Sequence, residues 1–151
     1  MTVAALLAAL LALYRPPADI AARIDAHRIE ITAQALAASE ATGVPAGLIV
    51  VVGLFESHLG QDLASGGSWG SPVSRRSRRV AGGAWHTARD LAASLRVCGT
   101  WTRALARYRI GDCASTRVRG YQVATVMRAV RRIYIDAGLP TPAGIDVDPP
   151  R

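Results

Sequence analysis

An uninterrupted apolar run from Leu48 to Phe55 constrains the fold of this chain more than any other feature. Its periodicity does not separate a buried strand from a buried helix, because every position is apolar. Pro45 suits the first turn of a helix and the run contains no turn signal, so a helix is favoured. Three consecutive valines are poor helix formers in isolation, which leaves a strand as the alternative. In either case the element is expected to lie at the centre of the fold.

Helical patterns surround this run and predict a mainly α fold. A long helix is expected from Ala18 to Ala41, with His27 on its apolar stripe as a hydrogen-bonded core residue and Gly43 as its stop. Residues 61–83 are rich in Gly and Ser, and we expect a long loop there with at most a short β element. The three later helices have apolar stripes at Ala88, Leu91, Ala92 and Leu95, at Trp101, Ala104, Leu105 and Tyr108, and at Val123, Val126, Met127, Val130, Ile133, Tyr134 and Ala137.

A length of 151 residues suits one domain, which we place at residues 1–140, followed by a Pro-rich tail at 141–151 that is expected to be extended. The apolar segment at residues 1–17 has no basic residue before its Ala- and Leu-rich stretch and no clear small-residue cleavage site. These features favour a short helix docked on the core over a cleaved signal peptide. The longest uninterrupted apolar stretch of the chain is also far shorter than the roughly 18 residues of a membrane-spanning helix.

The charge of the chain is strongly uneven. Its net charge is +7, all of its basic residues are Arg, and 14 of the 18 Arg lie between Arg75 and Arg132. A basic half predicts an anionic partner, which is a cell-wall or envelope polymer, a membrane surface or nucleic acid. Few aromatic residues and no recognisable nucleic-acid motif disfavour the last. The codon bias of a GC-rich genome is the simpler explanation for the lack of Lys.

Glu56 is the candidate catalytic residue. It is the first ionisable residue after the apolar run, and a Gly-rich segment follows shortly after it. A carboxylic acid at the end of a buried element is partly desolvated, which favours its protonated form. A protonated carboxylic acid near neutral pH is what acid-catalysed glycoside cleavage requires. The alternative is an ordinary exposed residue at the end of a helix.

Two short motifs resemble the soluble lytic transglycosylases of the lysozyme-like superfamily. Glu56-Ser57-His58-Leu59-Gly60 resembles the Glu-Ser-x-x-Gly signature of that family, and residues 104–111 resemble its Ala-x-x-x-Tyr-Asn-x-Gly motif. A long helix and a Gly-Val-Pro step precede the first motif, and a final helix follows the second. The resemblance covers roughly residues 18–137. Each motif is weak alone, and their order and spacing make the match more specific.

The resemblance implies a lysozyme-like fold and a peptidoglycan lytic transglycosylase from a bacterium or a phage. Glu56 would act alone on the bond between N-acetylmuramic acid and N-acetylglucosamine and leave a 1,6-anhydro product. Ser57 would orient the Glu56 carboxylate, and Tyr108 would point its hydroxyl toward Glu56 or the sugar. Two departures concern sugar binding: Arg109 stands where the family has Asn, and residues 70–73 lack the Gln of the family's Gly-Leu-Met-Gln step.

Other side chains complete the expected site. The substrate-binding set is Ser57, Trp69, Tyr108 and Arg109; Trp69 joins it because it lies in the Gly-rich segment, whereas Trp101 is expected in the core. Asp62 as a second catalytic acid would instead give hydrolysis by a muramidase. No metal-ligand spacing is present, and no cofactor is expected.

Cys98 and Cys113 flank the helix that begins near Trp101. A disulfide between them suits an exported wall enzyme, in the periplasm, outside the cell or on a virion. Two reduced thiols in a cytosolic chain are the alternative. Two other functions also stay open, namely a basic nucleic-acid-binding protein and an inactive lysozyme-like protein kept for a structural role.

Overall fold

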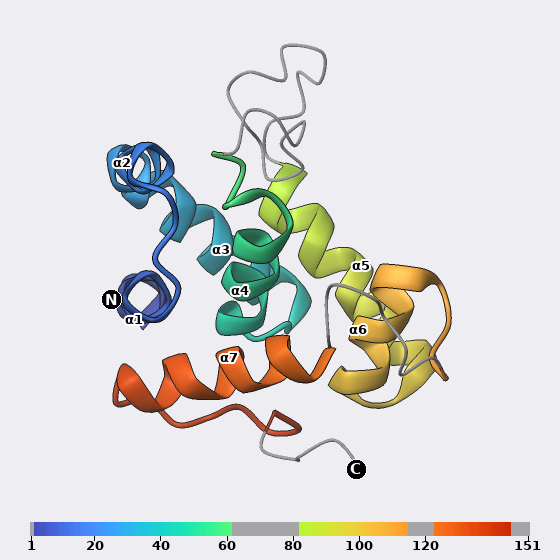
Figure 1. Cartoon of the computed structure of the whole chain (residues 1–151). Helices are drawn as coiled ribbons and strands as arrows, with labels where there is room; N and C mark the ends of the chain where they lie inside the picture. Colours follow the sequence, from blue (N-terminus) through green and yellow to red (C-terminus); the bar gives the residue numbers. More distant parts are fainter. Residues whose placement is uncertain (1, 62–81, 115–122, 146–151) are drawn as a thin grey trace.

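The computed structural model describes residues 2–61, 82–114 and 123–145, and in these ranges it holds seven helices and no strand (Figure 1). The prediction of a mainly α protein is therefore confirmed for these residues. The expected short β element falls in residues 61–83, which lie almost entirely outside the described ranges. The helices are α1 (Thr2–Leu13), α2 (Ala18–Ala26), α3 (Arg28–Thr42), α4 (Ala46–Ser57), α5 (Gly82–Cys98), α6 (Trp101–Ile110) and α7 (Val123–Asp136).

Helix α4 forms the centre of the fold, as its apolar run predicts. All residues from Ala46 to Leu54 are buried, and the helix contacts α1, α3, α5 and α7 (Figure 1). The three valines are helical because neighbours on several sides bury their branched side chains, and this burial outweighs a small intrinsic preference for strands. The prediction of a helix is confirmed.

Helix α1 packs against α3, α4 and α7, and its buried face consists of Val3, Leu6, Leu7 and Leu10. The N-terminal apolar segment is thus part of the hydrophobic core. None of the helices in the described residues combines the length and the apolar character needed to cross a membrane.

The expected single helix over residues 18–41 is wrong, because the chain bends at His27. This residue ends α2 with φ −107° and ψ 13°, and α3 begins at Arg28. The two helices contact different parts of the protein. Arg23 of α2 donates from Nε to the carbonyl oxygen of Gln61 at 3.1 Å, whereas α3 packs on α1, α4 and α5. The apolar spacing stays in phase across the bend, so it gave no sign of a break.

His27 is also not the core residue that was expected. Its side chain is 39% exposed, and its Nδ1 lies 3.7 Å from a carboxylate oxygen of Glu30. The bend places His27 at the junction of two helices rather than on a buried stripe.

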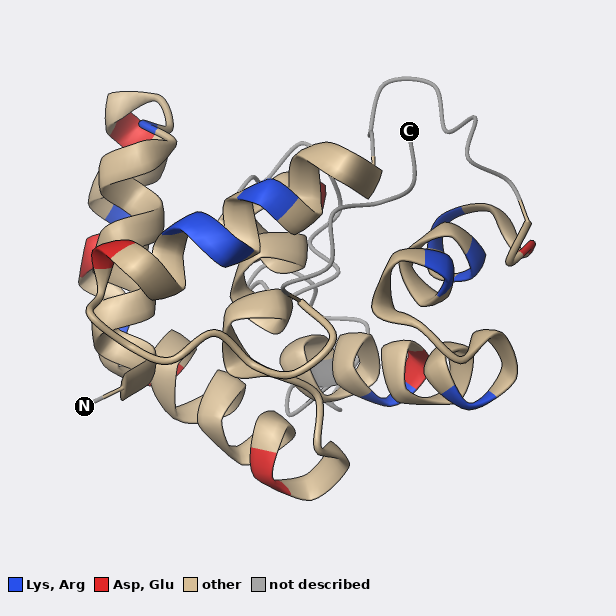
Figure 2. Ribbon diagram, turned by 90° about the horizontal axis from the view of Figure 1, so that it is seen from below, with Lys and Arg blue, Asp and Glu red and all other residues tan. Residues whose placement is uncertain are grey.

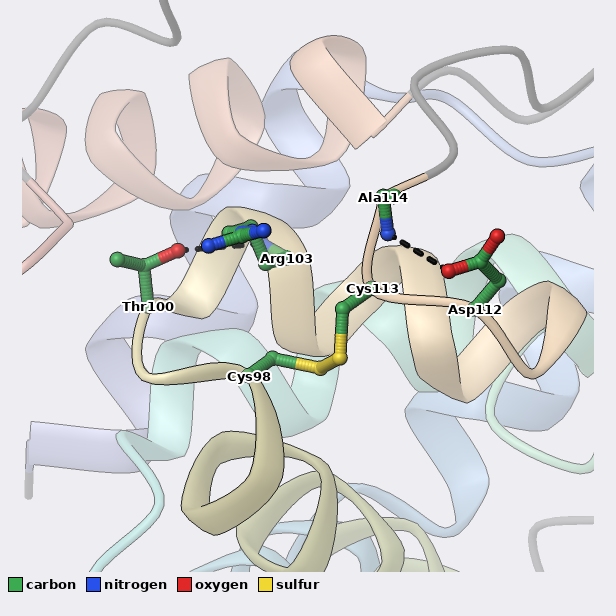
Figure 3. The surroundings of a disulfide bond; sticks show 6 residues. All are labelled: Cys98, Thr100, Arg103, Asp112, Cys113 and Ala114. Atoms are coloured by element: carbon green, nitrogen blue, oxygen red, sulfur yellow. Dashed lines mark hydrogen bonds between the residues drawn. A yellow bond between two sulfur atoms is a disulfide. The ribbon is translucent and has the colours of Figure 1, made fainter.

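Helices α5 and α6 form a hairpin that a disulfide closes. The chain turns at Gly99, which has φ +81°, and the hydroxyl of Thr100 caps α6 by accepting from the N–H of Arg103 at 3.4 Å (Figure 3). The predicted bridge between Cys98 and Cys113 is present, with 5.5 Å between the two Cα atoms. It ties the end of α5 to the residues just beyond α6.

Helix α7 has a buried apolar stripe, as predicted, and its charged residues lie off that stripe. The chain after it differs from the expected extended tail. Ile145 is fully buried, and its N–H donates to the carbonyl oxygen of Pro142 in a turn at 3.1 Å. Gly144 lies against the ring of Trp101, so this part of the tail belongs to the core.

Candidate active site

Glu56 lies in the last turn of α4, at the boundary between the core and solvent. The side chain is 12% exposed. Glu56 belongs to the same helix as the buried residues Ala46–Leu54. The core therefore holds the backbone that carries the Glu56 carboxylate in place. This placement agrees with the expectation that Glu56 ends a buried element.

Helix α4 ends at Ser57, and a left-handed turn follows from His58 onward. His58, Leu59 and Gly60 have φ values of 49°, 59° and 78°. The N–H groups of His58 and Leu59 donate back to the carbonyls of residues 54 and 53, each at 2.9 Å. These bonds satisfy carbonyls at the helix end that would otherwise lack partners. Two consecutive non-glycine residues with positive φ are uncommon and costly, which marks this turn as held by its surroundings.

Ser57 contributes to this turn. Its hydroxyl accepts a hydrogen bond from the N–H of Gly60 at 3.0 Å, and the residue is only 2% exposed. A side chain that is buried to this extent has little surface for contact with a ligand. The structure therefore places Ser57 where it supports the backbone next to Glu56, rather than on the carboxylate or in a substrate-binding position.

Tyr108 of α6 meets Glu56 across 52 residues of sequence. Its hydroxyl donates to Oε2 of Glu56 at 2.8 Å. Burial is the main cause that raises the pKa of Tyr108 well above the ordinary 10.0, and the charge and hydrogen bond of Glu56 raise it further. The phenol thus remains a hydrogen-bond donor over the whole physiological pH range. This is the geometry that the resemblance implied for Tyr108.

Arg109 holds the second oxygen of the same carboxylate. Its Nη1 donates to Oε1 of Glu56 at 3.1 Å, and its side chain is 34% exposed. Because Arg109 lies in the last turn of α6, the helix dipole also favours a cation there. Consecutive residues of α6 therefore hold the two oxygens of Glu56.

Two residues of α5 belong to the site and were missed in the sequence. Thr87 is 4% exposed, and its side chain acts to lower the pKa of Tyr108, whereas the negative charge of Asp90 acts to raise it. A signal existed for Thr87, since it is a polar residue directly beside Ala88 on the buried stripe of the helix. Asp90 lies one turn further along the same helix, and its carboxylate oxygen is 3.6 Å from Nε of Arg89.

The remaining expected site residues lie elsewhere. Trp69 and Asp62 fall outside the described residues, so their predicted roles stay predictions. Trp101 is 7% exposed in the core, as expected. Trp85 is 41% exposed, and the Arg89 guanidinium lies 5.1 Å from its ring centroid.

A hollow of about 250 Å³ borders the Glu56 turn on the side of α1. Its rim includes Tyr14, Arg15, Phe55 and His58, and the rings of Tyr14 and Phe55 meet edge to face with 4.9 Å between centroids. Among the described residues, no group of three His, Cys, Asp or Glu side chains could hold a metal ion.

Charge is unevenly distributed over the described helices, as in the sequence. Arg residues outnumber acids along α5, α6 and α7, whereas α2 and α3 carry four acids, Asp19, Asp25, Glu30 and Glu40, and two Arg, Arg23 and Arg28 (Figure 2). The basic run at residues 75–79 lies outside the described residues.

Comparison of the chain with protein-family models, with curated proteins and with solved structures found no match.

Proposed function

We propose that this chain is a peptidoglycan lytic transglycosylase with a lysozyme-like fold and that Glu56 is its single catalytic acid and base. One observation carries the proposal: the carboxylate at the end of a buried helix is held on both oxygens by Tyr108 and Arg109 of a distant helix. Glu56 and Tyr108 belong to the two motifs that resemble the family, whereas Arg109 stands where the family has Asn. A carboxylate fixed in this way, and still 12% exposed, is partly accessible to a ligand at the surface.

The proposed reaction needs one carboxyl group and no water. Protonated Glu56 gives its proton to the glycosidic oxygen as the bond from C1 of N-acetylmuramic acid to that oxygen breaks. The C6 hydroxyl of the same sugar then forms a bond to C1, and its proton passes to Glu56. The products are a strand that begins with N-acetylglucosamine and a strand that ends in a 1,6-anhydro ring. The internal hydroxyl replaces the second carboxylate that most glycosidases use.

The contacts of Glu56 suit the second half of this reaction directly. The hydrogen bonds from a phenol and a guanidinium fix the position of the Glu56 oxygens, and a carboxylate is the form that removes a proton. Tyr108 also fixes the direction of the lone pairs. The first half of the reaction, proton transfer to the glycosidic oxygen, needs a proton on Glu56. It therefore requires that the hydrogen bond from Arg109 to Glu56 weakens.

Hydrolysis by a muramidase is the second candidate, and Asp90 is the observation that favours it. Its charge acts on Tyr108, which itself contacts Glu56, and its carboxylate is exposed beside Arg89. A water molecule activated by that carboxylate would replace the C6 hydroxyl, and the product would be a reducing sugar.

The disulfide and the Arg-rich helices suit a role at the cell wall. A disulfide persists in the periplasm, outside the cell or on a virion. Arg side chains on α5, α6 and α7 would attract anionic wall polymers. Peptidoglycan glycan strands are thus the proposed partner.

Mass spectrometry of the products from purified sacculi and from peptide-free glycan strands tests the proposal. We expect anhydro-muramic products from the wild type and a loss of about 10²–10⁴-fold in rate for Glu56→Gln, which keeps the shape but removes the transferable proton. Glu40→Gln is the matched control, because Glu40 is exposed on α3. Reducing products would indicate the muramidase instead. Strong retention of duplex DNA without release of sugar would favour the nucleic-acid-binding alternative.

A further inference from the structure

The Arg109 side chain contacts the candidate catalytic residue Glu56 and is also partly exposed to solvent. Its Nη1 lies 3.1 Å from Oε1 of Glu56, yet its side chain is 34% exposed against 12% for Glu56. A ligand that approaches Glu56 from solvent therefore meets this guanidinium. The bond to Glu56 also shows that the guanidinium is already in a position where it binds a carboxylate.

The proposed substrate carries a carboxylate close to the bond that is broken. N-acetylmuramic acid has a lactyl group on C3 of the ring whose C1 is cleaved. In intact wall this carboxyl group is an amide with the peptide stem, and it is a free carboxylate only where the stem has been removed. A free carboxylate near Glu56 would be repelled unless a cation lies between the two groups.

Arg109 is the cation placed to do this. Arg89 lies beside the Trp85 ring and has its Nε 3.6 Å from Asp90. Arg107 shares the last turn of α6 with Arg109, but two residues along a helix correspond to a rotation of about 200°, so its side chain leaves on the opposite side. Arg109 is the Arg whose guanidinium donates a hydrogen bond to Glu56.

Building on the proposed function, we propose that Arg109 binds the free lactyl carboxylate of N-acetylmuramic acid, so that the preferred substrate is a glycan strand without peptide stems. The substrate carboxylate replaces Glu56 as the partner of the guanidinium. Glu56 then keeps its contact with Tyr108 and loses its contact with Arg109. An amidase reaction that removes the stems must supply this substrate.

Binding of a disaccharide that cannot be cleaved tests this proposal apart from catalysis. The probe is N-acetylglucosamine linked to a terminal N-acetylmuramic acid, which lacks the scissile bond, and its comparison ligand is the lactyl methyl ester. Calorimetry should show that the wild type binds the acid at least about tenfold more tightly than the ester, the lower range for a hydrogen bond to a charged group. Arg109→Gln should lose this ratio, and Arg109→Lys should keep part of it.

Arg107→Gln is the control, because it removes one positive charge from the same turn of α6 and should keep the full ratio. Melting curves show whether each variant is folded. Equal binding of acid and ester by the wild type, an unchanged ratio in Arg109→Gln, or no binding of either sugar would overturn the proposal. If the ratio depends on Arg109 but no glycan is ever cleaved, the recognition stands and the proposed reaction fails. If glycan is cleaved without any such ratio, the reaction stands and the recognition fails.

Discussion

The hydroxyl of Tyr134 accepts a hydrogen bond from the N–H of Gly47 at 3.1 Å and thereby joins the last helix to the first turn of α4. The ring lies so close to Gly47 that a Cβ atom there would clash with Cε2 of Tyr134. An N–H in the first turn of a helix has no partner within the helix, and Tyr134 supplies one. The contact anchors one end of α4, and Glu56 lies near the other.

Gly47→Ala should therefore destabilise the protein although Ala is the better helix former. The methyl group has no room beside the Tyr134 ring, and overpacking of this kind costs about 1–3 kcal/mol. Urea unfolding measures the loss. The Tyr134→Leu background should reduce it, because the ring that causes the clash is gone. Equal losses in both backgrounds would show that the clash is not the cause.

Tyr108→Phe should lower the rate of glycan cleavage by about 10–10²-fold, which is the value of one hydrogen bond to a charged group. The change removes the 2.8 Å bond to Glu56 and leaves the ring in place. Tyr134→Phe is the matched control, since it removes a buried hydroxyl far along the sequence from the Glu56 contacts. It should cost stability and leave the rate unchanged. A normal rate in Tyr108→Phe would contradict a role for its hydroxyl.

Removal of the Cys98–Cys113 disulfide by the double Ser substitution should cost about 2–4 kcal/mol of unfolding free energy, because the bridge closes a 15-residue separation. Thiol titration of the denatured, unreduced wild type should find no reactive thiol. Two thiols per chain would contradict the bridge.

The sequence predicts the core of this fold better than the path of the chain. The apolar run at Leu48–Phe55 identifies the central element because burial on all sides needs apolar residues at every position. The bend at His27 escapes prediction because the apolar spacing remains in phase across it. Ile145 escapes because the short stretch between Pro142 and Pro149 holds too few apolar residues to show a helical period.

The candidate site shows the same division. The carboxylate of Glu56 is recognisable from its place after the apolar run. Its contact with Tyr108 depends on a tertiary approach across 52 residues, which no local pattern encodes, and only the resemblance of two motifs indicated it. The hydrogen bond from Arg109 to Glu56 could not be predicted either. Arg109 lies off the apolar stripe of its helix, and the helical spacing of apolar residues says nothing about the partners of such a side chain.

Alkaline unfolding should depend on the tyrosines to an unusual degree in this protein. The chain has no Lys, and Cys98 and Cys113 are joined in a disulfide. Burial is the main cause that raises the pKa values of both Tyr108 and Tyr134 above 10.0 in the folded state. Above pH 10.0 the unfolded chain therefore loses protons that the folded chain keeps.

The sign of the effect follows from this difference in bound protons. The stabilisation from the two tyrosines is complete below pH 10.0 and decreases as the pH rises toward their folded-state values, by at most about 1.4 kcal/mol per pH unit for each tyrosine. Urea unfolding at a series of pH values measures how the free energy of unfolding changes with pH. The phenolate absorbance of the folded protein should show tyrosines that ionise only above pH 10.0. Tyr108→Phe and Tyr134→Phe should each make the slope shallower. A slope that is unchanged in both variants, or a stability that increases above pH 10.0, would contradict the burial of these two phenols.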